Sequence, residues 1–328
     1  MGLDLPLIPR IPGLECRNGG RLHQEYETGK IHASPKGSAS IFSTKQKIQM
    51  TPIHTRITVG VAKPLRFLHV TDSHLISADE RDSERKRELA RQRREAYDKH
   101  GFDCCRRGLD AAFDYARRRN EPVLHTGDLI DFVSYRNLEL AREKLSSVDC
   151  FFAAGNHEFS KYVGEAQEDE AYKLDSLPLV APAFPNDLRF AARLAGGVNL
   201  VAVDNTYGQV RRQELERFRA EIAKGYPILL LLHVPLYTRE LYREQIEVRK
   251  AESASLMGCP AEHPARNDAQ CPDADTLAFI DFLKRQTLVK AVLAGHLHYD
   301  WEGPLYGDVT QYVTAGSFLG RAREIEVA

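Results

Sequence analysis

Beyond residue 64, short apolar runs alternate with longer stretches of helical periodicity. The apolar runs predict strands over 66–71, 122–126, 150–154, 199–203, 228–233, 289–294 and 310–314. The periodic stretches predict helices over 104–118, 136–145, 211–223 and 275–285. In the last of these, Leu277, Ile280 and Leu283 recur at a spacing of three, which predicts one buried helix face. Strands that alternate with helices favour the α/β class.

The pattern divides the chain into an extension and one domain. Residues 1–60 contain several prolines, a Gly-Gly pair and a Ser/Thr/Lys-rich stretch at 34–47. This composition predicts an amino-terminal extension that is irregular or partly strand, with a possible edge strand at 57–59. Residues 61–328 form the predicted domain.

Two insertions interrupt the domain. The stretch 78–100 is densely charged with both signs and predicts a solvated helix, although its arginines also have the chemistry to bind phosphate. The stretch 238–273 is rich in Glu, Arg, Pro and Ala and predicts a lid or a surface loop. Because it follows a polar strand end, we expect it to shape access for a substrate.

Charge and hydropathy exclude some classes of protein. The formal net charge is -1, so we do not expect a nucleic-acid partner. No window approaches the roughly 20 continuous apolar residues of a membrane span, and the amino terminus lacks a secretory signal. The six cysteines form no C-x-x-C pair. We therefore expect reduced thiols and a cytoplasmic protein.

Two cysteines and a histidine have the donor atoms of a zinc site. Cys259 and Cys271 flank a loop that contains His263. Two thiols and one imidazole are an incomplete tetrahedral set, so an ordinary loop is favoured. Nothing in the sequence indicates the oligomeric state.

Five polar motifs lie at or just after the carboxyl ends of five predicted strands. They are Asp72-Ser73-His74, Gly127-Asp128-Leu129-Ile130-Asp131, Gly155-Asn156-His157-Glu158, His233 and Gly295-His296-Leu297-His298. In open α/β sheets ligands bind at the carboxyl ends of the strands, so these motifs are expected to converge. Each supplies oxygen or imidazole ligands, and none supplies a thiolate.

The motifs together predict a metal centre, although each one alone is weak evidence. Carboxylate, amide oxygen and imidazole suit Mn, Fe or Zn, and two such ions about 3.5–4 Å apart can clamp a displacement at phosphorus. Asp128 is a natural bridge between two ions. The predicted ligands, too many for a closed tetrahedral zinc site, are Asp72, His74, Asp128, Asn156, His233, His296 and His298.

The ordered set resembles the calcineurin-like metallophosphoesterase family, whose pattern is D-x-H, G-D-x-x-D, G-N-H-[E/D], a lone His and G-H-x-H. The resemblance covers about residues 65–328. It implies a four-layer sandwich, in which two mixed β-sheets pack face to face with helices outside. It also implies hydrolysis of a small phosphoester, either a monoester or a diester.

The resemblance further implies a role for each residue. Asp72, His74 and His298 would hold one divalent or trivalent ion, and Asn156, His233 and His296 the other, with Asp128 and a hydroxide bridging them. His157 would act as the general acid, oriented by Asp131. Glu158 is expected to support its loop, and His69 and His125 to pack within strands.

There are departures and an alternative. Phe132-Val133 stands where the protein Ser/Thr phosphatase branch has Arg-Gly, which disfavours a phosphoprotein phosphatase. The nuclease branch usually adds a carboxy-terminal capping domain, and we expect none here because only about thirty residues follow His298. The alternative function is a non-catalytic scaffold that binds proteins. Scaffolds of this kind tend to lose ligands, whereas this sequence keeps all seven.

Overall fold

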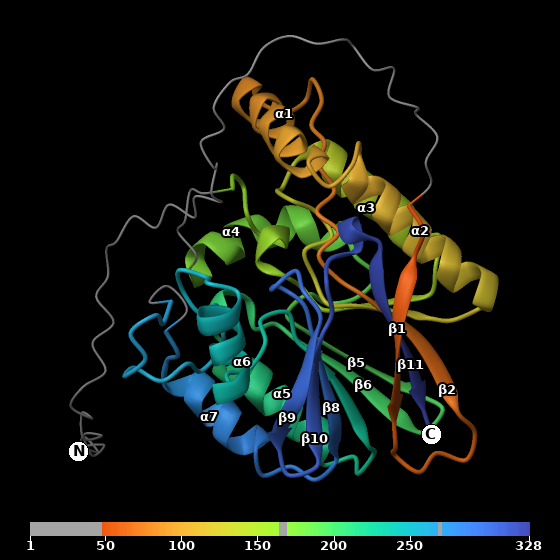
Figure 1. Ribbon diagram of the computed structural model, residues 1–328, viewed down its shortest axis with the longest axis vertical. Helices are drawn as coiled ribbons and strands as arrows, with labels where there is room; N and C mark the ends of the chain where they lie inside the picture. Colours follow the sequence, from red (N-terminus) through yellow and green to blue (C-terminus); the bar gives the residue numbers. More distant parts are fainter. Residues whose placement is uncertain (1–47, 164–168, 268–270) are drawn as a thin grey trace, which may run out of the picture.

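Two mixed β-sheets form the centre of the molecule (Figure 1). The computed structural model describes residues 48–163, 169–267 and 271–328. The first sheet has five strands in the order β1 (Thr51–Ile57), β11 (Arg321–Val327), β2 (Leu65–Val70), β3 (Val123–His125) and β4 (Cys150–Phe152). The second has six, in the order β5 (Phe190–Ala195), β6 (Val198–Val203), β7 (Ile228–Leu231), β8 (Val289–Ala294), β10 (Val309–Val313) and β9 (Trp301–Tyr306).

The loops that contain the predicted ligands follow parallel strands of the two sheets. In the first sheet β2, β3 and β4 run parallel, while β11 pairs antiparallel with β2. In the second, β6, β7, β8 and β10 run parallel, and β5 and β9 pair antiparallel at the two edges. β6 and β7 are buried along their whole length, as expected of parallel strands that are covered on both faces.

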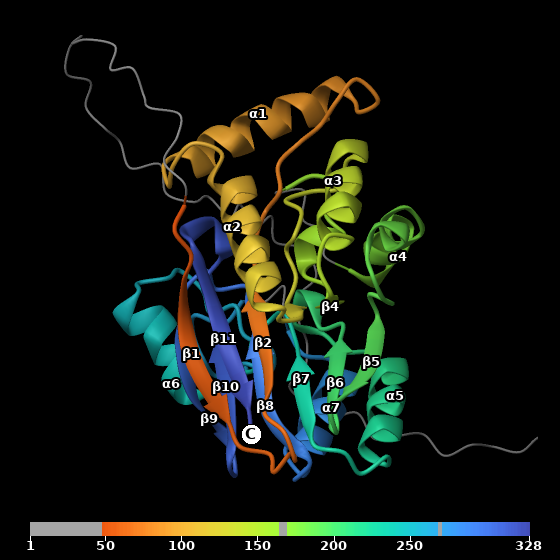
Figure 2. The ribbon, with the colours of Figure 1, turned by 90° about the vertical axis from the view of Figure 1, so that its right-hand side faces the viewer.

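Five of the seven α-helices in the described residues cover the outer faces of the sheets. The bounds of all seven are α1 (Glu84–Asp98), α2 (Cys104–Arg119), α3 (Tyr135–Leu145), α4 (Glu170–Val180), α5 (Arg212–Ile222), α6 (Arg239–Arg243) and α7 (Ala274–Leu283). Apolar residues of α2, α3 and α4 pack on the first sheet, and those of α5 and α7 pack on the second. Figure 2 shows α5 beside β5 and β6.

The inner faces of the sheets pack on each other. Phe67, Leu124 and Phe151 of the first sheet share one buried cluster with Leu200 and Leu231 of the second. The molecule thus has a helix layer, two sheets and a second helix layer. This confirms the predicted four-layer sandwich.

The strands and helices predicted beyond residue 64 are all present, with ends displaced by at most two residues. The possible edge strand at 57–59 is displaced further, because β1 ends at Ile57. The buried face of α7 differs from the prediction. Leu277 is 41% exposed, whereas Phe279, Ile280 and Leu283 are buried. A helix turns 100° per residue, so a strict spacing of three drifts off the buried face, and Phe279 takes the place of Leu277.

The sequence patterns missed several elements, of which β5, β9 and β11 are strands. β5 and β9 are edge strands with exposed residues, so their apolar signal is weak. β11 contains Arg323, a fully buried arginine that contacts Thr55, Glu302 and Thr314. A charged residue at a buried strand position hides the strand from a hydropathy pattern.

The two predicted insertions are both ordered where described. α1 is the solvated helix expected within 78–100, and Ala90 is its one fully buried residue. It lies at one end of the molecule, beyond α2 (Figures 1 and 2). The stretch 238–273 includes α6, and its Leu241 and Leu256 share a cluster with Ala294 and Val313 of the second sheet.

The structure tests the predictions of reduced thiols and of no membrane span. Cys104, Cys105, Cys150 and Cys259 are free, whereas Cys271 is disulfide-bonded. The prediction of reduced thiols is correct for these four and wrong for Cys271, which also lacks the thiolate that a zinc site would need. Among the described residues, no helix combines the length and the apolar character needed to cross a membrane.

Close contact between α2 and the loop after β10 supports the ligand loops. A Cβ at Gly108 would lie 2.1 Å from the carbonyl oxygen of Ser317. The Ser317 backbone N–H donates to Thr71 (3.0 Å) and its hydroxyl donates to Ser73 (2.8 Å). The residues on either side of Asp72 are therefore held against α2.

We expect Gly108→Ala to destabilise the protein, although alanine normally stabilises a helix interior. The added methyl meets backbone, which cannot rotate away, so the free energy of unfolding should fall by roughly 3 kcal/mol. Chemical denaturation measures this change. Arg118→Ala, at an exposed position of the same helix, is the control and should change stability by less than about 0.5 kcal/mol. Equal stability of the two variants would contradict the close contact.

Candidate metal centre

The five motifs converge at the carboxyl ends of the parallel strands. Asp72 and His74 follow β2, Asp128 follows β3 and Asn156 follows β4, all in the first sheet. His233 follows β7, and His296 and His298 follow β8, both in the second sheet. Because the sheets pack face to face, loops from both reach one point.

Unusual backbone conformations aim the side chains at this point. Asp72, His74, Asp128, His296 and His298 have φ between 49° and 71°. Non-glycine residues in this left-handed region are uncommon, and such strain concentrates at functional sites. Hydrogen bonds maintain it: the His74 N–H donates to the Asp128 carbonyl (2.9 Å), and the His296 N–H donates to the Asp72 carboxylate (2.9 Å).

Two glycines allow the loops after β3 and β4 to touch. A Cβ at Gly127 would lie 2.4 Å from the nitrogen of Gly155. A Cβ at Gly155 would lie 2.2 Å from Oδ1 of Asp128. A side chain at Gly155 would displace the Asp128 carboxylate, and one at Gly127 would push the two loops apart.

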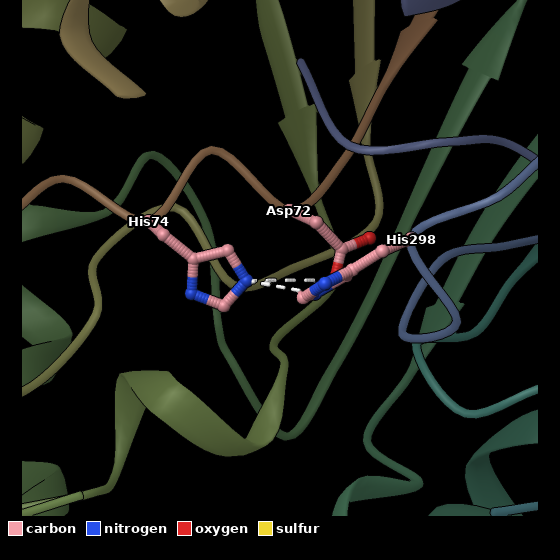
Figure 3. A group of neighbouring side chains, drawn as sticks. All are labelled: Asp72, His74 and His298. Carbon is pink, nitrogen blue, oxygen red and sulfur yellow. Dashed lines mark hydrogen bonds and ion pairs between the residues drawn. The ribbon is translucent and has the colours of Figure 1, made fainter. Parts of the chain in front are cut away.

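One group of ligands consists of Asp72, His74 and His298 (Figure 3). Nε2 of His298 lies 3.3 Å from Oδ1 of Asp72 and 3.0 Å from Nε2 of His74. Nε2 of His74 lies 3.9 Å from the same Asp72 oxygen. Figure 3 shows the three side chains pointing toward one another from two separate loops.

The second group consists of Asp128, His233 and His296, with Asn156 beside them. Nε2 of His233 lies 3.2 Å from Oδ2 of Asp128 and 3.2 Å from Oδ1 of Asn156. Nδ1 of His296 lies 3.1 Å from Nε2 of His233. The structure thus brings all seven predicted ligands together.

Asp128 lies between the two groups. Its Oδ2 is 3.2 Å from His233 in one group and 3.9 Å from His74 in the other. Its Oδ1 accepts a hydrogen bond from the backbone N–H of His157 (2.9 Å). One oxygen is therefore fixed by the protein, and the other faces both groups.

The hydrogen bonds of two histidines leave their Nε2 atoms available as ligands. Nδ1 of His233 donates to the carbonyl of Thr126 (2.7 Å), and Nδ1 of His74 donates to Asp131 (3.1 Å). Each Nε2 in its neutral ring then carries a lone pair directed into the centre. Imidazole nitrogens that face each other at 3.0–3.1 Å need a cation or a proton between them. This donor set fits two metal ions.

Burial and charge set the protonation of the centre. Burial lowers the pKa of His74 to about 4 and that of His296 to about 3, which favours the neutral form that binds metal. Burial opposes the charge on Asp128, but His233 and His157 outweigh it and hold the pKa of this carboxyl well below its usual value.

His233 differs from the other buried imidazoles. Burial opposes its charge, but Asp128 and Asp72 outweigh burial and raise the pKa of His233 to about 9. A cation that enters this site at neutral pH must therefore displace a proton from His233. Metal binding is expected to release protons and to weaken as the pH falls.

Asp131 contacts His157 through its backbone carbonyl rather than through its side chain. The carbonyl of Asp131 accepts from Nδ1 of His157 (2.6 Å), whereas its carboxylate lies 3.7 Å away. The carboxylate instead accepts from Nδ1 of His74 and pairs with both Nε and Nη2 of Arg93 (2.7 and 2.8 Å). Sequence patterns placed Arg93 on a solvated face and missed this contact.

Glu158 supports its loop, as expected. Its buried carboxylate accepts from the backbone N–H groups of Asp128 (2.8 Å), Leu129 (2.8 Å) and Gly155 (2.7 Å). Burial and the charge of Asp128 raise the pKa of Glu158 to about 8, while the N–H donors favour its ionised form. Glu158 thus ties the loop after β3 to the loop after β4.

Asn205 is a supporting residue that the sequence patterns did not reveal. Its Oδ1 accepts from the backbone N–H of His233 (2.9 Å), and its Nδ2 donates to the carbonyl of Val234 (2.6 Å). It follows β6, so its place at a strand end was the available signal. It fixes the turn that presents His233.

His69 and His125 pack within strands, as expected. The His69 ring contacts the hydroxyls of Thr126 (2.8 Å) and Thr314 (2.9 Å). The His125 ring stacks on Phe152 with 5.0 Å between ring centroids. Burial lowers the pKa of each histidine to about 3, so both are neutral.

Two solved structures are among those similar to this chain. A dimetal phosphatase from Danio rerio is 14% identical, with 77% of this chain and 88% of that chain covered and a TM-score of 0.41. A phosphopantetheinyl hydrolase from Mycobacterium tuberculosis is 12% identical, with coverages of 80% and 90% and a TM-score of 0.38.

The sequence comparisons give the family. No match was found among curated protein sequences. The family model described as calcineurin-like phosphoesterase matches residues 65–300, which is more than half of the chain and includes every ligand motif. This chain therefore belongs to the calcineurin-like phosphoesterase family.

Proposed function

We propose that this protein hydrolyses a small phosphoester at a dinuclear metal centre. The observation that supports this best is the convergence of the seven predicted oxygen and nitrogen ligands, with Asp128 between His74 on one side and His233 on the other. Asp72, His74 and His298 would hold one ion, and Asn156, His233 and His296 the other. Bound there, the two ions would supply positive charge for the phosphate oxygens and lower the pKa of a bound water.

His157 is the proposed general acid. Its Nδ1 donates to the Asp131 carbonyl, which leaves Nε2 as the atom that exchanges a proton. The ring lies edge-on to His74, with 4.7 Å between centroids, and its side chain is 15% exposed. It is thus close to the ligands and reachable by a substrate. Its role is to give a proton to the leaving-group oxygen.

The competing function is a scaffold that keeps the fold for binding proteins. Five of the predicted ligands have a strained backbone conformation, and each such residue costs about 1–3 kcal/mol of stability. A scaffold that binds no metal would not need these conformations. The two functions separate in one experiment: protein reconstituted with Mn²⁺ is assayed against aryl phosphate mono- and diesters, nucleotides, cyclic nucleotides and phospholipid headgroups. Metal-dependent hydrolysis of any of these compounds supports the enzyme. If none of them is hydrolysed, the result supports the scaffold.

We expect His157→Ala to reduce kcat by about 10²- to 10⁴-fold, because the leaving group loses its proton donor. Metal content should stay at the wild-type value, since His157 is not among the seven ligands. Steady-state assays and elemental analysis measure the two quantities. His54→Ala, at a position with a 72% exposed side chain, is the control. Unchanged hydrolysis of an aryl phosphate would remove His157 from the mechanism.

We expect Asp128→Ala to lose one or both ions, because Asp128 is the carboxylate that both ligand groups share. Elemental analysis after dialysis gives the metal-to-protein ratio. Asp281→Ala, an exposed carboxylate on α7, should keep the wild-type ratio. A wild-type ratio in the Asp128 variant would refute the bridging role.

A further inference from the structure

Arg93 connects α1 to the metal centre through a buried carboxylate. Its guanidinium donates through Nε to Oδ2 of Asp131 (2.7 Å) and through Nη2 to Oδ1 (2.8 Å). Two parallel N–H bonds to one carboxylate fix its plane as well as its position. The Asp131 side chain is 0% exposed and that of Arg93 is 15% exposed, so the pair is largely shielded from water.

The same carboxylate reaches a predicted metal ligand on its other side. Oδ1 of Asp131 accepts from Nδ1 of His74 (3.1 Å). That hydrogen bond sets the rotation of the imidazole, whose opposite nitrogen, Nε2, faces Asp72 and His298. Carboxylates that hold the far nitrogen of a ligand histidine fix its orientation, and their loss typically weakens metal binding by 10- to 100-fold.

We propose that Arg93 is a positioning residue for the metal centre, which acts through Asp131 to hold His74 in the orientation that binds an ion. This inference rests on the proposed metal centre but not on any substrate. Without Arg93, a buried negative charge would lose its ionic partner, and the carboxylate would turn toward other donors or admit water. Nε2 of His74 would then lose its fixed direction.

The position of Arg93 makes α1 part of the centre. α1 contributes one fully buried residue, Ala90, so apolar packing holds it weakly. Its contacts near the ligands are polar or aromatic: Arg93 on Asp131, and Tyr97 against the His74 ring at 5.3 Å between centroids. The charged insertion at 78–100 therefore supports His74, which precedes it in the sequence.

Titration of the wild-type and variant proteins with Mn²⁺ alone, followed by calorimetry, tests the proposal. In Arg93→Ala we expect the Kd of one ion to rise by about 10- to 100-fold. Arg93→Lys should fall between wild type and alanine, because an ammonium group cannot reproduce the two-point pairing. Arg91→Ala is the matched control. It lies on the same helix with a 58% exposed side chain, paired with Glu88 and Glu95, and should bind as wild type does.

Activity gives a second readout if the wild type turns over a phosphoester. The lost kcat of Arg93→Ala should return as Mn²⁺ is raised, because the defect lies in metal occupancy. Three results would overturn the proposal: an unchanged Mn²⁺ Kd with a lower melting temperature, an unchanged Kd with a higher KM, or equal Kd values in the alanine, lysine and wild-type proteins. The first would make Arg93 structural, and the second would make it a substrate contact.

The titration separates this proposal from the proposed function. A wild type that binds Mn²⁺ but hydrolyses no ester would refute the activity and leave the Arg93 comparison intact. A wild type that binds no Mn²⁺ would refute both. Turnover by the wild type with an unchanged Kd in Arg93→Ala would refute the positioning role alone.

Discussion

The carboxylate of Asp128 is the point on which the rest of the centre depends. It comes from the middle one of three parallel strands, and its two oxygens have different tasks. Oδ1 is held by the backbone of His157, while Oδ2 faces histidines that belong to both sheets. The Asp128 backbone in turn donates to Glu158 and accepts from Ser73 and His74. Moving this one residue would shift the loops after β2, β3 and β4 together.

The fold places several buried acidic and imidazole side chains around this carboxylate, at a cost in stability. Buried acids and imidazoles within 4 Å of each other are unfavourable unless they pair or bind a cation. Here they are held by backbone groups and by rigid strand ends. Five of the ligand residues also keep strained left-handed conformations. Apolar packing between the sheets stabilises the scaffold that maintains both features.

Sequence patterns were sufficient for the strands that are buried on both faces and for the convergence of the polar residues that follow them. Such strands need continuous apolar runs, and the ligands must be Asp, Asn or His whatever surrounds them. The patterns failed where a charged residue is buried or an apolar residue is exposed. β11 is hidden because Arg323 is buried, and the face of α7 was misassigned because Leu277 points to solvent while Phe279 does not. The disulfide at Cys271 has no local signal either.

The supporting residues follow a different rule from the ligands, which explains why most of them were missed. Asn205 and Arg93 act through hydrogen bonds to a backbone or to another side chain, so their identity is set by geometry rather than by a motif. Arg93 lies among several other arginines of α1, and nothing in the spacing distinguishes it from Arg91. Only the folded structure places one guanidinium on a buried carboxylate and leaves the other in water. The motifs therefore indicate which residue types gather at the predicted centre, and the long-range contacts hold those residues in their orientations.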